Sequence, residues 1–159
     1  MSDDRLQLIL DRQSIRETLF RHAVYCDEAD LTRMDEIWAP EASRDNGAGH
    51  VEIVGRDAMA ERLAAGLRRY NWTHHHLGDS LIDIRGDEAS AMTYVACWHE
   101  STSGERFWGT ARYYDKLRRS DNGRWLITFR RMIITGTEGA MQEIDAARLD
   151  RWVTKEYAL

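Results

Sequence analysis

The stretch Asn71-Trp72-Thr73-His74-His75-His76-Leu77-Gly78 holds three of the six histidines side by side, at the start of a predicted strand. Successive side chains of a strand point to opposite faces of the sheet, so His75 points one way while His74 and His76 point the other. Three adjacent residues of a strand cannot converge on one ion, and no cluster of further ligands at regular spacing follows. The run therefore predicts no metal site.

The composition predicts a single globular domain over residues 1–159. Of its 159 residues, 43% are hydrophobic and 31% charged, and the net charge is −5. This length is sufficient to bury a core and to enclose a pocket, and the negative charge argues against binding to nucleic acid or to a membrane. The acidic start, Met1-Ser2-Asp3-Asp4, matches neither a signal peptide nor a membrane span, so we expect a cytoplasmic protein. Cys26 and Cys97 form no CxxC pair and are predicted to be buried thiols.

The first half of the chain has the pattern of helices and a hairpin. Apolar residues recur at three- and four-residue steps from Asp4 to Glu28, which predicts a long amphipathic helix, and Asp27 continues its buried stripe. The pattern then predicts a second helix at 31–38 that Asp30 caps and Pro40 stops, a hairpin at 41–54 with Val51 and Ile53 inward, and a third helix that begins at Gly55-Arg56-Asp57 and ends near Asn71.

The second half has the two-residue period of strands. Four long strands are predicted, at 72–84, 89–101, 106–117 and 124–135, and Asp121-Asn122-Gly123 is a strong hairpin signal between the last two. A final helix is predicted from Ala140 to Tyr157, as a lid or a dimer contact. Helices followed by an antiparallel meander indicate an α+β domain, in which three N-terminal helices pack on a strongly curved antiparallel sheet and leave a cone whose mouth is a ligand site.

The order and spacing of several short motifs resemble the SnoaL-like branch of the nuclear transport factor 2-like superfamily over nearly the whole chain. The resemblance implies a cone-shaped, cystatin-like fold. That fold hosts isomerases, dehydratases, cyclases, hydrolases and non-catalytic subunits, so the motifs specify the fold better than the reaction. The motifs are Ile15-Arg16-Glu17, Asp27 with Asp30, Trp38-Ala39-Pro40-Glu41-Ala42, Gly55-Arg56-Asp57-Ala58, Thr73-His74-His75-His76-Leu77-Gly78, Gly86-Asp87-Glu88-Ala89 and Asp121-Asn122-Gly123-Arg124-Trp125.

Within this branch the pattern is most similar to that of scytalone dehydratase, hexachlorocyclohexane dehydrochlorinase and bile acid 7α-dehydratase. The similarity implies that Asp27 and His75 form a pair that removes a proton from carbon. A second histidine of the dehydratase corresponds to His99 by strand position. The dehydratase tyrosine that precedes the aspartate is Cys26 here, and Tyr25 is one residue further away.

These observations predict a cofactor-free lyase, of dehydratase or dehydrohalogenase type, acting on a small, largely apolar cyclic substrate. A neutral imidazole can act as the base if a carboxylate sets its tautomer and stabilises the imidazolium. We expect Asp27 and His75 to be catalytic, and the substrate to be bound by Tyr25, His99, Tyr113 and Arg131. An isomerase or polyketide-type cyclase with the same pair, a non-catalytic binding module and an oxygenase subunit are the alternatives. A homodimer or homotrimer through the outer sheet face is expected.

Overall fold

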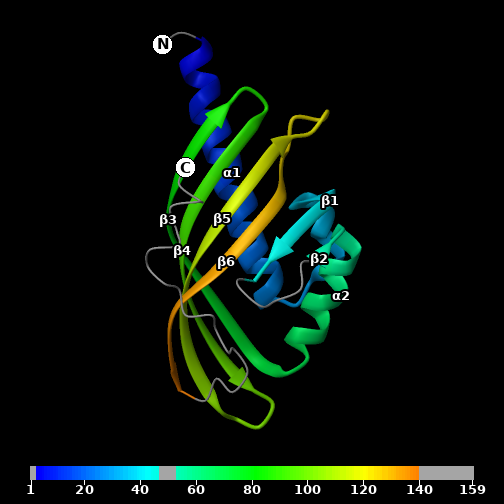
Figure 1. Cartoon of the computed structure of the whole chain (residues 1–159), viewed down its shortest axis with the longest axis vertical. Helices are drawn as coiled ribbons and strands as arrows, with labels where there is room; N and C mark the ends of the chain where they lie inside the picture. The colour runs from blue at the N-terminus through cyan, green and yellow to red at the C-terminus, as the bar shows by residue number, and fades with distance from the viewer. Residues whose placement is uncertain (1–2, 47–52, 140–159) are drawn as a thin grey trace.

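A six-stranded sheet, in the order β2-β1-β6-β5-β4-β3, forms the framework of the molecule (Figure 1). The structure is a computed structural model that describes residues 3–46 and 53–139. The elements in this part of the chain are α1 (Asp3–Asp27), the 3-10 helix η1 (Leu31–Glu36), β1 (Trp38–Asp45), β2 (Ile53–Val54), α2 (Arg56–Leu67), β3 (Tyr70–Arg85), β4 (Glu88–Ser101), β5 (Arg106–Arg119) and β6 (Trp125–Gly139).

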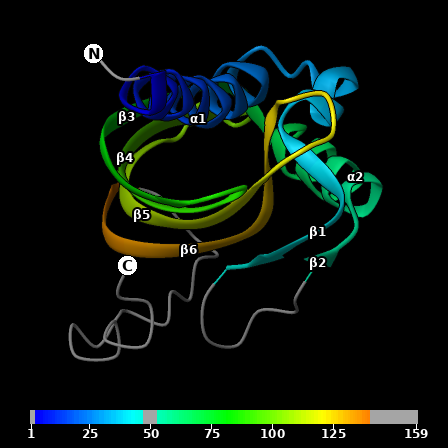
Figure 2. The same cartoon turned by 90° about the horizontal axis from the view of Figure 1, so that it is seen from above.

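The predicted α+β class, with helices packed on a strongly curved sheet, is confirmed. Strands β3 to β6 form an antiparallel meander that bends around one side of the molecule, while α1 and α2 close the other side (Figure 2). The prediction of a wholly antiparallel sheet is wrong, because β1 joins the far edge of the meander and runs parallel to β6. This mixed edge brings the β1 side chains next to the interior of the cone.

The predicted short helix at 31–38 is only partly correct. Asp30 does cap a helical turn, since its carboxylate accepts a hydrogen bond from the Thr32 N–H, but the turn ends at Glu36. Trp38 pairs with Ile127 of β6 and is fully buried. Pro40 lies within β1, where the register shifts between Trp38 and Ser43. Proline has no N–H to give to a ladder, so the irregular part of the strand accommodates it.

Helix α1 packs only part of its predicted apolar stripe. Ile15, Leu19 and Ala23 are buried at the expected helical spacing, whereas Phe20 is 57% and Ile9 is 54% exposed. The N-terminal turns of α1 project beyond the sheet in Figure 1, so the apolar side chains there have no sheet to pack against. The buried end of the helix is therefore the end that carries Asp27.

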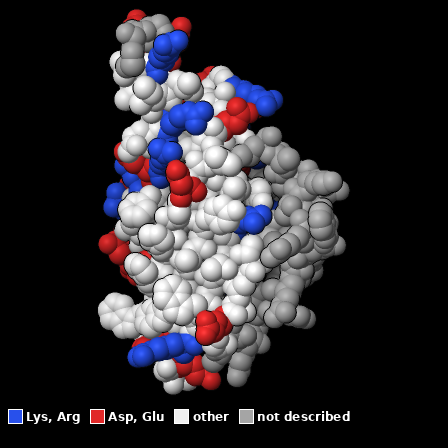
Figure 3. All heavy atoms as spheres, turned by 90° about the vertical axis from the view of Figure 1, so that its left-hand side faces the viewer, with Lys and Arg blue, Asp and Glu red and all other residues white. Residues whose placement is uncertain are grey.

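The outer face of the meander carries large apolar side chains. Trp72 is 68% exposed, and Tyr94 and Trp108 are each 52% exposed. On the side of the molecule shown in Figure 3, acidic and basic side chains are interspersed and uncharged residues form much of the surface. Trp72, Tyr94 and Trp108 are thus apolar parts of the outer surface.

Two predictions lie outside the described residues: the tip of the 41–54 hairpin with Val51, and the final helix from Ala140 to Tyr157. The two ends of the hairpin are described, and β1 and β2 pair antiparallel through Ser43 and Val54 as predicted. Within residues 3–46 and 53–139, the helices are too short or too polar to cross a membrane.

A buried carboxylate fastens α1 to the turn between β5 and β6. Both oxygens of Asp11 accept hydrogen bonds from Arg119, at 2.6 and 2.7 Å, and one also accepts from the Trp125 indole N–H at 3.2 Å. These bonds, led by that from Arg119, lower the pKa of Asp11 from 3.8 to about 2. A carboxyl group with a depressed pKa in the folded state stabilises the fold above its unfolded pKa, and this contribution is lost as the pH falls through the folded pKa.

Replacing Asp11 by Asn is expected to lower the free energy of unfolding at pH 7 by about 1 to 2 kcal/mol, because Arg119 keeps some solvent access that screens the loss. The difference from the wild type should shrink as the pH falls from about 4 to 2, where the wild-type carboxyl becomes protonated. Urea unfolding at several pH values measures both effects. Asp79→Asn, at a side chain that is 89% exposed, is the matched control and should change stability by less than about 0.5 kcal/mol. An equal loss in both variants would contradict the role of Asp11.

Candidate active site

The end of α1 meets the start of β3 through one carboxylate and one imidazole. Asp27 is the last residue of α1, and its Oδ1 lies 2.6 Å from Nδ1 of His75. The backbone N–H of His75 donates to Oδ2 of Asp27 at 2.8 Å, and the Thr73 hydroxyl donates to Oδ1 at 2.9 Å. Three donors from one strand thus hold both carboxylate oxygens in place.

This contact sets the tautomer of the histidine. Burial acts to raise the pKa of Asp27, but hydrogen bonds from the side chain and backbone of His75 outweigh it, so the pKa lies below its ordinary value. An ionised carboxylate can only accept hydrogen bonds, which requires Nδ1 of His75 to carry the proton. The lone pair is then on Nε2, the ring nitrogen remote from Asp27.

The strand alternation places His75 on the inner face of the sheet and His74 and His76 on the opposite face, and the three-histidine run predicted this opposition. His74 and His76 are exposed, whereas the His75 side chain is only 14% exposed. His75 pairs with Cys97 across β3 and β4, and Cys97 pairs with Gly109 of β5. These inward positions form a continuous row across three strands.

His99 lies next to His75 in an aromatic cluster. Its ring stacks on Phe107 with centroids 4.5 Å apart, contacts Tyr70 at 4.8 Å, and meets the edge of His75 at 5.4 Å. Burial, assisted by the charge that His75 can carry, lowers the pKa of His99 from 6.5 to about 4. The Nδ1 atom of His99 is buried without a hydrogen-bond partner. His99 is thus a neutral ring beside His75.

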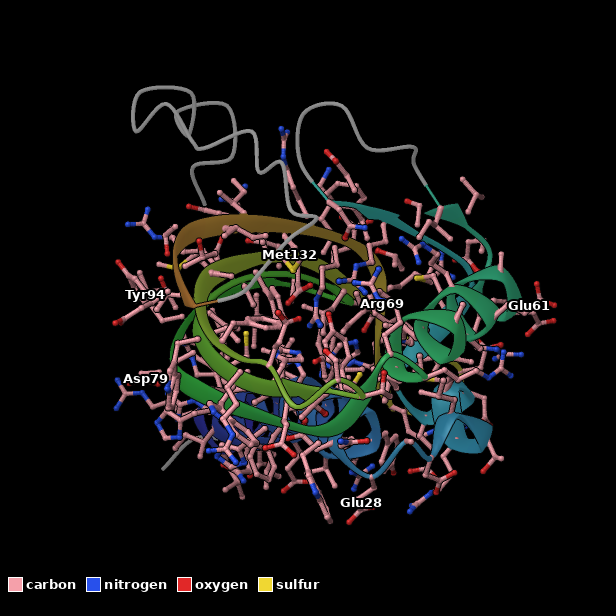
Figure 4. The ribbon with its side chains drawn as sticks, turned by 90° about the horizontal axis from the view of Figure 1, so that it is seen from below. Glu28, Glu61, Arg69, Asp79, Tyr94 and Met132 are labelled. Atoms are coloured by element: carbon pink, nitrogen blue, oxygen red, sulfur yellow. The ribbon has the colours of Figure 1, made fainter. Side chains whose placement is uncertain are left out.

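A cavity of about 230 Å³ opens in front of these rings, between the inner face of the sheet and α2. Figure 4 shows Met132 on the inner side of the curved sheet, while Tyr94 and Asp79 point away from it. The wall is apolar and aromatic with a few polar groups. Its polar and aromatic members are His22, Cys26, Arg44, Asn46, Arg62, Tyr70, His75, Cys97, His99, Phe107, Thr110 and Tyr113, and its aliphatic members include Met59, Leu63, Val95, Met132 and Ile134.

Of the six predicted site residues, the structure places His75, His99 and Tyr113 in the wall of this cavity, and Asp27 is linked to it through its hydrogen bond to His75. Tyr113 is buried, and burial raises the pKa of its hydroxyl to about 12, so the phenol is neutral at pH 7. His99 and Tyr113 are thus both uncharged members of the cavity wall.

Tyr25 and Arg131 are not brought to this cavity. The Tyr25 hydroxyl donates to Glu36 at 2.8 Å, because two residues of a helix rotate a side chain by about 200° and so turn Tyr25 away from the side that carries Asp27. Arg131 forms an ion pair with Asp45 at 3.3 Å. It is one residue away from the inward-facing Met132, and a shift of one residue reverses the face in a strand.

Two cavity residues were missed by the sequence prediction. His22 is buried on α1, with its ring edge toward Trp38 and Tyr113, and burial lowers the pKa of its imidazole well below 6.5. The signal was present, since His22 follows Ile15 by seven residues on the buried stripe. Arg44 had no such signal. The hairpin prediction for residues 41–54 did not indicate which face of the strand Arg44 would take.

One group in the described part of the chain has the composition of a metal site. The ligand atoms of His75, Cys97 and His99 all lie within 4.8 Å of one another. Burial raises the pKa of the Cys97 thiol to about 11, and its Sγ donates to the Gly109 carbonyl at 3.5 Å, so the thiol is protonated at pH 7. A metal ion would need that thiolate, and it would compete for the same Nε2 that a base requires.

A second, wider hollow of about 780 Å³ lies elsewhere on the sheet. Its wall contains Glu41, Asp83, Arg85, Lys116 and Arg118 together with residues near the β3–β4 turn. His75, His99 and Asp27 are not among the residues that line this hollow. The smaller cavity is therefore the one with the arrangement of a chemical site.

The fold and the cavity define a class of domain in which a curved sheet and covering helices form a cone with an Asp–His pair in its wall. The SnoaL-like domain family matches residues 7–131, which is most of the chain. The protein belongs to this family, as the sequence resemblance implied. A comparison with curated proteins found no match.

Solved structures confirm the fold. A protein from Novosphingobium aromaticivorans, provisionally described as a scytalone dehydratase, has a TM-score of 0.78 and 20% identity, covering 89% of this chain and 93% of that one. A hexachlorocyclohexane dehydrochlorinase from Novosphingobium barchaimii has a TM-score of 0.73 and 15% identity over 89% and 95% of the two chains. An NTF2-like protein with a cystatin-like fold from Novosphingobium aromaticivorans has a TM-score of 0.71 and 24% identity over 84% and 91%.

The environment of His99 can be tested by titration. We expect its imidazole to stay neutral as the pH falls to about 4, because the surrounding rings exclude water from the charged form. Carbon-13 NMR of histidine-labelled protein measures the midpoint, and His99→Asn assigns the signal. A midpoint near the ordinary value of 6.5 would show that the ring is solvated.

Proposed function

We propose that the protein is a cofactor-free lyase that removes a proton from carbon of a small cyclic substrate and expels water or another leaving group. The observation that carries this proposal is the 2.6 Å contact between Asp27 and Nδ1 of His75 beside a small, aromatic-walled cavity. A base needs a ring nitrogen that can take up a proton, and because this contact engages Nδ1, Nε2 is the nitrogen that serves this role in the neutral ring.

The elimination can be written with this chain's own residues. The C–H bond beside a carbonyl breaks, its proton goes to Nε2 of His75, and the electron pair forms an enolate on the carbonyl oxygen. The enolate then returns to a ketone as a carbon–carbon double bond forms and the bond to the β-hydroxyl breaks. The departing oxygen takes the proton back from the imidazolium and leaves as water. Asp27 stabilises the imidazolium and remains ionised throughout.

The relatives support the reaction class. Two of the similar structures bear the names of a dehydratase and a dehydrochlorinase, both of which denote eliminations. Isomerisation and cyclisation share the first proton transfer, so the same pair serves them equally well. The elimination is preferred because the names of these two relatives denote it. The uncharged rings of His99 and Tyr113 in the wall are hydrogen-bonding groups for an enolate oxygen in any of these reactions.

The test uses β-hydroxy cyclic ketones in a spectrophotometric assay, because loss of water gives a conjugated enone that absorbs in the near ultraviolet. His75→Ala and Asp27→Asn are each expected to lower the rate by about 10²- to 10⁴-fold, the usual contribution of a positioned base. His76→Ala is the matched control: it removes the same side chain two residues along β3, at an exposed position, and should keep the wild-type rate.

Circular dichroism of each variant verifies that the fold is kept. If the His75→Ala variant kept the wild-type rate, His75 would not be the catalytic base and the lyase proposal would be wrong. If ketones of the panel bind without forming an enone, and their α-protons do not exchange in heavy water, the cavity is a binding module and not an active site. Exchange without enone formation would instead assign an isomerase or cyclase.

We also propose a homodimer or homotrimer through the outer sheet face. The exposed aromatic residues Trp72, Tyr94 and Trp108 provide the apolar area that such a contact needs. Sedimentation equilibrium should give a dimer or trimer mass for the wild type, and Trp108→Glu should shift it toward the monomer because a carboxylate would be buried without a partner. A monomeric wild type would contradict this assembly.

A further inference from the structure

Arg44, the half-buried arginine of the cavity wall, has no ionic partner among the described residues. Arg44 is carried by β1 to the cavity wall, where its Nη2 lies 3.7 Å from the sulfur of Met132. Its Nε is buried and makes no hydrogen bond. Among the residues at 3–46 and 53–139, no carboxylate lies within ion-pair distance of Arg44.

The neighbouring arginines are different. Arg130, the β6 residue opposite Arg44 in the parallel ladder, is fully buried and donates two hydrogen bonds to Asp115, at 2.7 and 3.0 Å. Arg131 has Asp45, and Arg119 has Asp11. Arg44, which is half-buried, therefore contrasts with the paired arginines around it.

The groups around Arg44 do not neutralise it. Burial lowers the pKa of His22 and raises the pKa values of Cys26 and Tyr113 to about 11 and 12, so all three are uncharged at pH 7. Asp115 is already bound to Arg130. The guanidinium groups of Arg44 and Arg130 thus have one carboxylate, Asp115, near them. Because Asp115 pairs with Arg130, the positive charge of Arg44 is not compensated by the described residues.

An uncompensated charge in an apolar wall opposes folding, and burial also lowers the pKa of the Arg44 guanidinium. A ligand that brings a negative charge removes this cost. The free Nε, beside Nη2, presents the planar edge that pairs with both oxygens of a carboxylate. The buried Oδ1 of Asn46, which also lacks a partner and also lines the cavity, places a second polar group at the same end of β1.

We propose that Arg44 is an anion-binding residue and that the substrate is a ring compound bearing an ionised carboxylate. The carboxylate binds Arg44, and the ring fills the apolar wall between Leu63, Val95 and Phe107, so that its far side reaches His75. This inference rests on the proposed function for the role of His75, but the anion site stands on its own contacts. Arg44 thus takes the place of Arg131, the arginine that the sequence analysis expected to bind the substrate.

Calorimetric binding of 2-naphthoate and of its neutral analogue 2-naphthamide tests the proposal. The wild type is expected to bind the carboxylate about 10- to 100-fold more tightly than the amide, the range of a charge-assisted pair. Arg44→Met should bring the two affinities within about twofold, since only the charged partner of the carboxylate is removed. Arg44→Lys keeps the charge and should retain part of the preference. Arg112→Gln is the matched control, because Arg112 stacks on Tyr94 at the outer face.

The melting temperature separates a binding role from a structural one. Arg44→Met should melt at or above the wild-type temperature, since it removes an unpaired buried charge. Should it fail to fold, Arg44→Gln and Arg44→Lys give the same comparison with polar side chains. Equal affinities for the two probes in the wild type, or an unchanged preference in Arg44→Met or Arg44→Gln, would overturn the anion site.

The anion site and the lyase reaction can be tested separately. If the preference for naphthoate depends on Arg44 but His75→Ala keeps full turnover, the anion site stands and the lyase proposal fails. If His75→Ala abolishes enone formation while Arg44→Met keeps the preference, the lyase stands and the anion site fails. His75→Ala itself should retain the preference for naphthoate, because His75 contributes to proton transfer and not to charge pairing.

Discussion

The hydrogen-bonded contact between Asp27 and His75 joins the packing of this domain to its chemistry. One carboxylate oxygen of Asp27 accepts hydrogen bonds from the imidazole N–H of His75 and from the Thr73 hydroxyl. The other accepts a hydrogen bond from the backbone N–H of His75 in β3. The end of α1 is thereby fixed to the strand that it crosses, and the same bonds orient the ring and choose its tautomer. The packing of α1 against β3 therefore also fixes the geometry of the site. Movement of α1 relative to β3 would break the hydrogen bonds that orient the imidazole.

Buried charged groups of the framework are paired: Arg130 with Asp115, and Asp11 with Arg119 and Trp125. Among the described residues, some buried side-chain atoms have no hydrogen-bond partner. Nε of Arg44, Oδ1 of Asn46 and Nδ1 of His99 belong to the cavity wall, whereas Nε1 of Trp38 and Nη1 of Arg130 lie elsewhere. An unsatisfied buried group weakens a fold, and a ligand in the cavity would complete the groups of its wall.

Local periodicity was sufficient to predict much of this arrangement. Alternation along β3 separated His75 from His74 and His76, whereas His99 was suggested only by its strand position in the resembled dehydratase. For two other residues the expected position differs from the structure by one or two residues along the chain. Tyr25 is on the wrong side of α1, and Arg131 is one residue out of phase with the cavity. His22 could have been found from its helical spacing, whereas Arg44 could not, because nothing in its local pattern indicated a strand beside β6.

The sequence by itself determined the long α1 helix, the four strands of the meander, their turns and the inward direction of His75, since each follows from the period of apolar residues or from glycine at a turn such as Gly123 (φ 81°). Only the tertiary structure decided that β1 runs parallel to β6, that Asp27 reaches His75 at 2.6 Å, and that Arg44 is left without a carboxylate while Arg130 obtains one. Short-range pattern sets the face that a side chain takes. Which distant group it meets there depends on pairing and packing between segments far apart in the chain.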